Sequence, residues 1–122
     1  ALIPVSVTNT GKIEVGLVQG GQTLKLDNPF ENSEGAINKH FAATKKIKQG
    51  SVDLVIWPEN AVMHDPFVRV RTKEAFASEV ARLKAPILVN ANLKDGTNGS
   101  VLIGQARRAM RLVILVNCMI GR

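Results

Sequence analysis

DLVIWPEN, residues 53–60, joins a run of apolar residues to a proline and a glutamate. The run from Val52 to Trp57 is almost continuously apolar, which is typical of a strand buried on both faces. Pro58 ends this strand, because proline has no amide hydrogen to donate to a neighbouring strand. Glu59 therefore follows the carboxyl end of a buried strand, the edge where open α/β sheets place their ligands.

Shorter apolar runs and two helical patterns surround this strand. Apolar residues at i, i+4 and i+7 predict helices from Ser33 to Gln49 and from Thr72 to Lys84. The element order β-α-β-α-β-β predicts an α/β fold with a mixed sheet. The predicted strands, in chain order, are residues 13–18, 52–57, 87–89 and 101–103.

The ends of the first helix carry their own signals. Residues 27–33 contain Pro29 and two asparagines and are predicted to form a loop. Three lysines fall in the last predicted turn, where cations interact favourably with the helix dipole, and Gly50 suits the position after the helix. The three lysines are Lys45, Lys46 and Lys48.

The composition is that of one globular domain. The chain has 122 residues, of which 45% are hydrophobic, so it is too apolar to belong to the disordered class. One cysteine, Cys118, excludes a disulfide framework and a Cys-rich zinc module. No run approaches 18 consecutive apolar residues, so no transmembrane segment is predicted in this chain. The first residues also lack the pattern of a signal peptide.

The net charge of +6 raises the question of a polyanionic partner, either nucleic acid or an anionic lipid surface. Residues 105–122 hold four arginines and no acidic residue, so two thirds of the excess charge lies in this segment. The chain has four phenylalanines, one tryptophan and no tyrosine, which is too few for an aromatic platform that stacks bases. Nucleic acid is therefore not expected as the partner.

Glu59 is the one candidate catalytic residue that the spacing singles out. Trp57 and Pro58 are expected to shield its carboxylate from water, and burial of a carboxyl group tunes it for general-base work. The alternative is a loop glutamate that caps a helix or faces solvent. His40 and His64 have no paired spacing with another ligand, so no metal site is predicted. Gly20-Gly21 matches no phosphate-binding loop and is interpreted as a tight turn.

DLVIWPEN also resembles the glutamate segment of the nitrilase, or carbon-nitrogen hydrolase, superfamily. Residues 15–20, VGLVQG, resemble the first strand and loop of its apolipoprotein N-acyltransferase branch, and residues 85–89 and 98–102 resemble its next two strands. The resemblance covers residues 12–104. It implies a lead-in or linker at residues 1–11, the N-terminal half of a carbon-nitrogen hydrolase domain at 12–104, and a divergent basic tail at 105–122.

This resemblance implies a partial nitrilase-like αββα sandwich and a Glu-Lys-Cys triad without cofactor or metal. Glu59 matches the glutamate, the general base that activates the cysteine thiol, and the lysine helps to stabilise the tetrahedral intermediate. The implied acyl donor is a membrane phospholipid, and the acceptor is the N-terminal diacylglyceryl-cysteine of an apolipoprotein. Full-length members lie in the cell membrane with the catalytic domain outside the cytoplasm.

The chain also departs from the family. No lysine follows Lys94, which lies in an Asp-Gly turn, and Cys118 comes too early for the nucleophile and is interpreted as buried and unreactive. Similarity stops at Gly104, as a truncated or frame-shifted reading of a longer gene would produce. An inactive fragment is therefore expected, lacking the remainder of the catalytic domain and self-associating through an exposed sheet face. The alternatives are a fragment of a soluble nitrilase-type amidase and a basic module that binds anionic lipid or nucleic acid.

Overall fold

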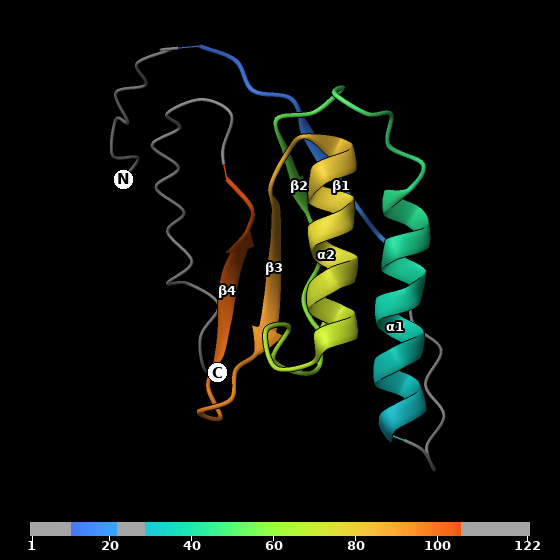
Figure 1. Cartoon of the computed structure of the whole chain (residues 1–122), viewed down its shortest axis with the longest axis vertical. Coiled ribbons are helices and arrows are strands. Elements are labelled where there is room, and N and C mark those ends of the chain that lie inside the picture. The colour runs from blue at the N-terminus through green and yellow to red at the C-terminus, as the bar shows by residue number, and fades with distance from the viewer. Residues whose placement is uncertain (1–10, 22–28, 106–122) are drawn as a thin grey trace, which may run out of the picture.

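A computed structural model describes residues 11–21 and 29–105 of the chain (Figure 1). The predicted element order β-α-β-α-β-β is confirmed, and so is the α/β class. The lead-in at residues 1–10, most of the basic tail and Cys118 lie outside the described residues. The elements are β1 (Val15–Leu17), α1 (Pro29–Thr44), β2 (Leu54–Ile56), α2 (Val70–Leu83), β3 (Ile87–Asn92) and β4 (Asn98–Ile103).

The four strands form one mixed sheet in the order β1-β2-β3-β4. The first three strands are parallel, because a helix connects each strand to the next. The connection from β3 to β4 is a short turn, so β4 runs antiparallel to β3. Gly96 in this turn has a φ of +86°, a backbone conformation that favours glycine.

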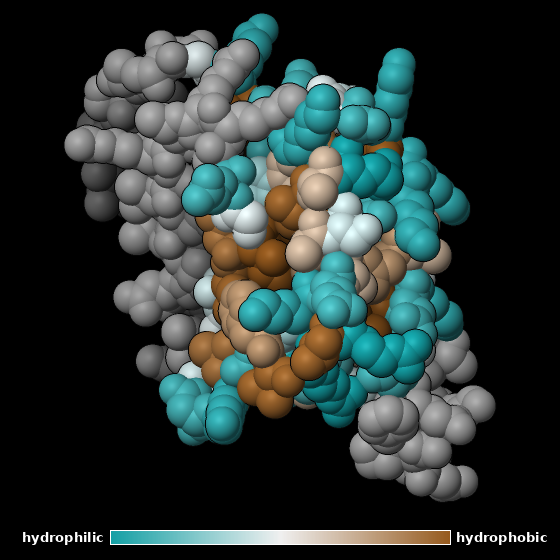
Figure 2. Space-filling model, in the orientation of Figure 1, coloured by the Kyte–Doolittle hydropathy of each residue, from teal (hydrophilic) through white to brown (hydrophobic). Residues whose placement is uncertain are grey.

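Both helices lie on the same face of the sheet and enclose the core (Figure 1). Val55 and Ile87 of the central strands are completely buried there. Trp57 contacts Phe41 of α1 and Phe76 of α2, with ring centroids 4.9 and 5.0 Å apart. Hydrophilic side chains gather over the outer surfaces of the helices, and hydrophobic ones over the strip of sheet beside α2 (Figure 2).

The predicted bounds of the first helix are wrong at both ends. Helix α1 begins at Pro29, within the predicted loop, because proline lacks the amide hydrogen that a first helical residue leaves unpaired. The helix ends at Thr44 instead of Gln49. The lysines predicted for its last turn therefore follow the helix, and all three are exposed to solvent.

Arg82 of α2 contacts the carboxyl end of α1. Its guanidinium donates hydrogen bonds to the backbone carbonyls of Thr44 and Ile47, at 3.0 and 2.9 Å. The same group binds the carboxylate of Glu79 at 2.9 Å, and Glu79 is buried. The amides of Lys45, Lys46 and Ile47 already pair the carbonyls of Phe41, Ala43 and Thr44, and Arg82 adds a partner from α2. This contact fixes α1 against α2.

The strands also differ from their predicted lengths. Strand β3 continues beyond Val89 to Asn92, and β4 begins at Asn98 instead of Val101. Asparagine disfavours strands, but pairing with β4 satisfies the backbone of this extension. The side-chain amide of Asn98 also donates to the side-chain oxygen of Asn92 at 2.8 Å.

Candidate active-site edge

The carboxyl ends of the three parallel strands lie at one edge of the sheet. The segment after β1 contains Gly20, the segment after β2 contains Glu59, and the segment after β3 contains Lys94. Polar residues from three separate parts of the sequence are thereby brought to the same edge. Ligands of open α/β sheets bind at this edge.

Trp57 is the residue that fixes the start of the β2 loop. Its side chain turns toward the helices, where its indole Nε1–H donates to the Thr44 hydroxyl at 3.0 Å. The Trp57 backbone amide donates to the carbonyl of Leu88 at 2.9 Å, which continues the pairing of β2 with β3. His40 of α1 lies 5.4 Å from the indole ring. The backbone at Trp57 is therefore held from both the sheet and helix α1.

Glu59 lies two residues beyond this anchor, in a turn, with its side chain exposed to solvent. The expectation that Trp57 and Pro58 shield this carboxylate is wrong in this structure. The sheet periodicity directs Trp57 into the core, and Pro58 then starts a turn that carries Glu59 outward. Asn60 completes the turn with a φ of 62°, a left-handed conformation that asparagine tolerates well.

Gly20 brings the loop after β1 against helix α1. A Cβ atom at this position would lie 2.6 Å from the backbone nitrogen of His40 and 2.7 Å from the carbonyl carbon of Lys39. No side chain fits in that space, so glycine is required for packing at this point. The two glycines are thus explained by a close backbone approach at Gly20 and by a φ of +77° at Gly21.

Asp65 joins the loop after β2 to the end of β3. Its Oδ1 accepts a hydrogen bond from the backbone amide of Phe67 at 2.9 Å, and its Oδ2 accepts one from the backbone amide of Lys94 at 3.0 Å. Lys94 lies in the turn that the sequence predicts, and its side chain is exposed. The Asp65 carboxylate therefore holds the loop after β2 against the turn that follows β3.

A histidine link between the two helices is the feature that sequence reasoning missed. The ring nitrogens of His64 lie 3.1 Å from the hydroxyl oxygens of Ser33 in α1 and Thr72 in α2. Burial lowers the pKa of His64 below 6.5, and the positive charge of Arg69 lowers it further, against opposing effects of Glu34 and Asp65. No spacing rule connects three residues so far apart in the sequence, and the only signal was the loop histidine itself.

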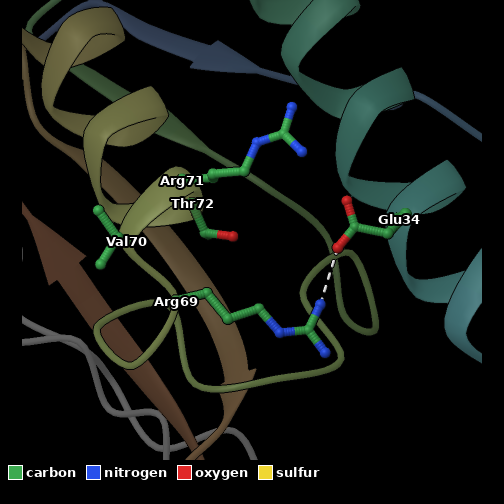
Figure 3. A pocket seen from close by; sticks show the side chains of 5 residues that line it. All are labelled: Glu34, Arg69, Val70, Arg71 and Thr72. Carbon is green, nitrogen blue, oxygen red and sulfur yellow. Dashed lines mark hydrogen bonds and ion pairs between the residues drawn. The ribbon is translucent and has the colours of Figure 1, made fainter.

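A cavity of about 530 Å³ opens beside this link (Figure 3). Arg69 and Arg71 extend from the start of α2 toward α1, with the Thr72 hydroxyl between them (Figure 3). Glu34 of α1 forms an ion pair with Arg69 at 2.7 Å, with both side chains 39% exposed. Since Glu34 already neutralises Arg69, the cavity wall carries one further cation, Arg71, and favours a small anion only weakly.

His40 is a structural histidine. It is buried, and its Nδ1–H donates to the carbonyl of Ala36 one turn earlier, at 2.7 Å. The hydrogen-bond partners of His40 and His64 are different residues. Within residues 11–21 and 29–105, no group of three or more His, Cys, Asp and Glu side chains is placed to hold a metal ion.

Helices α1 and α2, the two that the structure describes, are both too short and too polar to cross a membrane. Comparisons with protein-family models, with curated proteins and with solved structures found no match to this chain.

Proposed function

We propose that residues 12–104 form the N-terminal half of the catalytic domain of an apolipoprotein N-acyltransferase, with Glu59 as the general base. The observation that carries this proposal is the position of Glu59, just beyond the carboxyl end of β2 in a parallel part of the sheet. The segments that resemble the family, VGLVQG, DLVIWPEN, residues 85–89 and residues 98–102, fall in order on β1, β2, β3 and β4.

In this proposal Glu59 takes the proton of a cysteine thiol supplied by the other half of the domain. The thiolate attacks the ester carbonyl of a phospholipid and forms a tetrahedral intermediate that the family's lysine stabilises. The intermediate collapses to an acyl thioester, and Glu59 returns the proton to the departing lysophospholipid. The α-amine of the diacylglyceryl-cysteine then attacks the thioester. Glu59 removes the amine proton as the amide forms and returns it to the departing cysteine thiolate.

The exposure of the Glu59 carboxylate is compatible with a site completed by the other half of the domain. A general base works best where water is excluded and its proton affinity is tuned to the reaction. Within residues 11–21 and 29–105, the loop anchored by Trp57 positions Glu59 without covering it. The cover and the remaining two triad residues are assigned to the other half of the sandwich, and the chain by itself is expected to be inactive.

The proposal includes a membrane location for the full-length protein, with the catalytic domain outside the cytoplasm, since phospholipid is the donor. A soluble nitrilase-type amidase would differ in two ways. Its gene would encode no membrane spans upstream of this domain. Its acyl thioester would be transferred to water instead of to an amine.

Reconstitution tests the proposal. The 122-residue chain is co-expressed with the complementary half of a complete acyltransferase, which provides the lysine and the cysteine. Acyl transfer from a labelled phospholipid to a diacylglyceryl-cysteine peptide is then measured. Loss of Glu59 as base in Glu59→Gln is expected to lower the rate by about 10²-fold or more. Glu74→Gln is the matched control, because Glu74 is also an exposed carboxylate and lies on α2.

An unchanged rate in Glu59→Gln would refute the assignment of the base. Hydrolysis of the thioester without any transfer to the peptide amine would refute the acyltransferase and favour the amidase. If the two halves purify as a complex that is inactive with wild-type Glu59, the assignment of these residues to this family is wrong.

A further inference from the structure

The sheet face opposite the helices carries a continuous apolar row. Side chains alternate between the two faces of a strand, and the helix-facing set includes Val55 and Ile87. Their neighbours along the strands point to the other face. The strand registers pair Leu17 with Ile56, Ile56 with Leu88, and Leu88 with Leu102, so these four side chains cross all four strands in one line.

The margins of this row are open to solvent. Leu17 is 80% exposed and Leu102 is 45% exposed, at opposite edges of the sheet. Leu54 belongs to the same face, yet it is 1% exposed and lies outside the core cluster between sheet and helices. The strand positions on this face contain no charged residue. They are, besides the four-residue row, Val15, Leu54, Asn90, Asn92, Asn98 and Ser100.

We propose that the segment 106–122 of this chain packs across the apolar row. Strand β4 ends at Ile103, next to Leu102, so the segment begins beside one end of the row. It contains an uninterrupted apolar run from Leu112 to Val116, followed by Cys118, Met119 and Ile120. Its arginines flank this run and can remain in solvent while the run meets the uncharged face. The proposal describes the 122-residue chain by itself: in the sandwich of the proposed function, the complementary half would take this face in place of the segment.

The segment is long enough to cross the apolar row. Three strand-to-strand spacings of roughly 4.8 Å give a row about 14 Å long. The nine residues 112–120 span about 14 Å as a helix, at 1.5 Å per residue, and about 30 Å if extended, at 3.3 Å per residue. Either conformation reaches from β4 to β1. The six residues from 106 to 111 allow the chain to turn back over the sheet.

A tethered segment is favoured over a second copy of the chain as the occupant. Linkage through a few residues gives an effective concentration on the order of millimolar, far above a micromolar solution of separate chains. Two copies would also bring together two molecules that each carry a net charge of +6.

Cys118 is the only cysteine and reports directly on this packing. Its rate of reaction with a maleimide is measured in the full chain at low micromolar concentration and compared with the rate in denaturant. Packing on the row predicts protection of about tenfold or more in the native chain. Leu102→Asp is expected to remove most of this protection by placing a charge in the row, and Leu115→Asp is expected to do the same from the segment.

Val70→Asp is the matched control. Val70 is 67% exposed and lies on α2, away from the row, so this change should leave the protection intact. Trp57 fluorescence confirms that each variant is folded, because Trp57 is part of the buried core.

Three results would overturn the proposal. The first is labelling of the native chain as fast as in denaturant. The second is protection that neither aspartate variant reduces, which would place the segment elsewhere. The third is protection that disappears on dilution together with a dimer detected by light scattering, which would make a second copy the occupant.

Discussion

Replacing Arg82 with alanine tests how the two helices are held together. The guanidinium donates to the carbonyl of Thr44, the last residue of α1, and to that of Ile47 just beyond the helix, and it pairs with Glu79 on its own helix. Glu79 is 6% exposed, so Arg82→Ala leaves a buried carboxylate without its cation. The change therefore removes three interactions at one point and creates an unpaired buried charge.

The magnitude follows from these contacts. Each hydrogen bond to a carbonyl contributes about 1 kcal/mol to the free energy of unfolding. Breaking a fully buried ion pair costs about 3–5 kcal/mol, but the Arg82 side chain is 32% exposed, so solvent screening reduces that part to about 1–2 kcal/mol. Arg82→Ala is thus expected to destabilise the fold by about 3–4 kcal/mol. That is a large share of the stability of a small domain.

Urea unfolding followed by fluorescence of the single tryptophan, Trp57, measures this change. Trp57 is buried against α1, so separation of the helices alters its emission directly. Adding Glu79→Gln to Arg82→Ala should recover about 1–2 kcal/mol, because the buried carboxylate becomes a neutral amide. Lys73→Ala, an exposed change on the same helix, should stay within about 0.5 kcal/mol of wild type. A loss below about 1 kcal/mol, or no recovery in the double variant, would refute the reasoning.

Two further predictions concern stability. Burial lowers the pKa of His64, and the neighbouring Arg69 guanidinium lowers it further. The unfolded chain therefore binds a proton at His64 more readily than the folded chain does. The contribution of His64 to the free energy of unfolding is fully present above pH 6.5 and falls as the pH drops below it. The urea midpoint of wild type should fall as the pH is lowered, and this fall should be smaller in His64→Gln. An equal fall in the two proteins would contradict the role given to His64. Gly20→Ala should destabilise by about 1–3 kcal/mol because its Cβ meets helix backbone. Gly35→Ala, in an open position within α1, should stabilise by about 0.5–1 kcal/mol, and thermal melts that fail to separate the two would contradict the packing at Gly20.

The element order could be predicted from the sequence because it depends on local patterns. The buried run that ends at Pro58 and the regular spacing of Phe76, Val80 and Leu83 need no tertiary information to be recognised. The end of α1 is instead contacted by Arg82, which lies 38 residues from Thr44. Such a long-range contact leaves no signal in the local sequence around the lysines that follow the helix.

The sequence predicts where Glu59 lies in the fold, but it does not predict whether Glu59 is exposed to solvent. The placement of Glu59 at the edge of the sheet follows from the strand that precedes it. Its exposure depends on which way Trp57 faces, and that is decided by the pairing of β2 with β3 and by the Thr44 hydroxyl. The contacts of His64 with Ser33 and Thr72 join α1, the loop after β2 and α2, so no local sequence pattern predicts them.

The most direct test of the central claim is detection of the acyl thioester in the reconstituted complex. Mass spectrometry of the complementary half, after brief exposure to phospholipid without the acceptor peptide, reports whether its cysteine has been acylated. If Glu59 is the base, the thioester forms with wild type and with Glu74→Gln and is about 10²-fold slower with Glu59→Gln. Equal rates of thioester formation with wild type and Glu59→Gln would contradict the account.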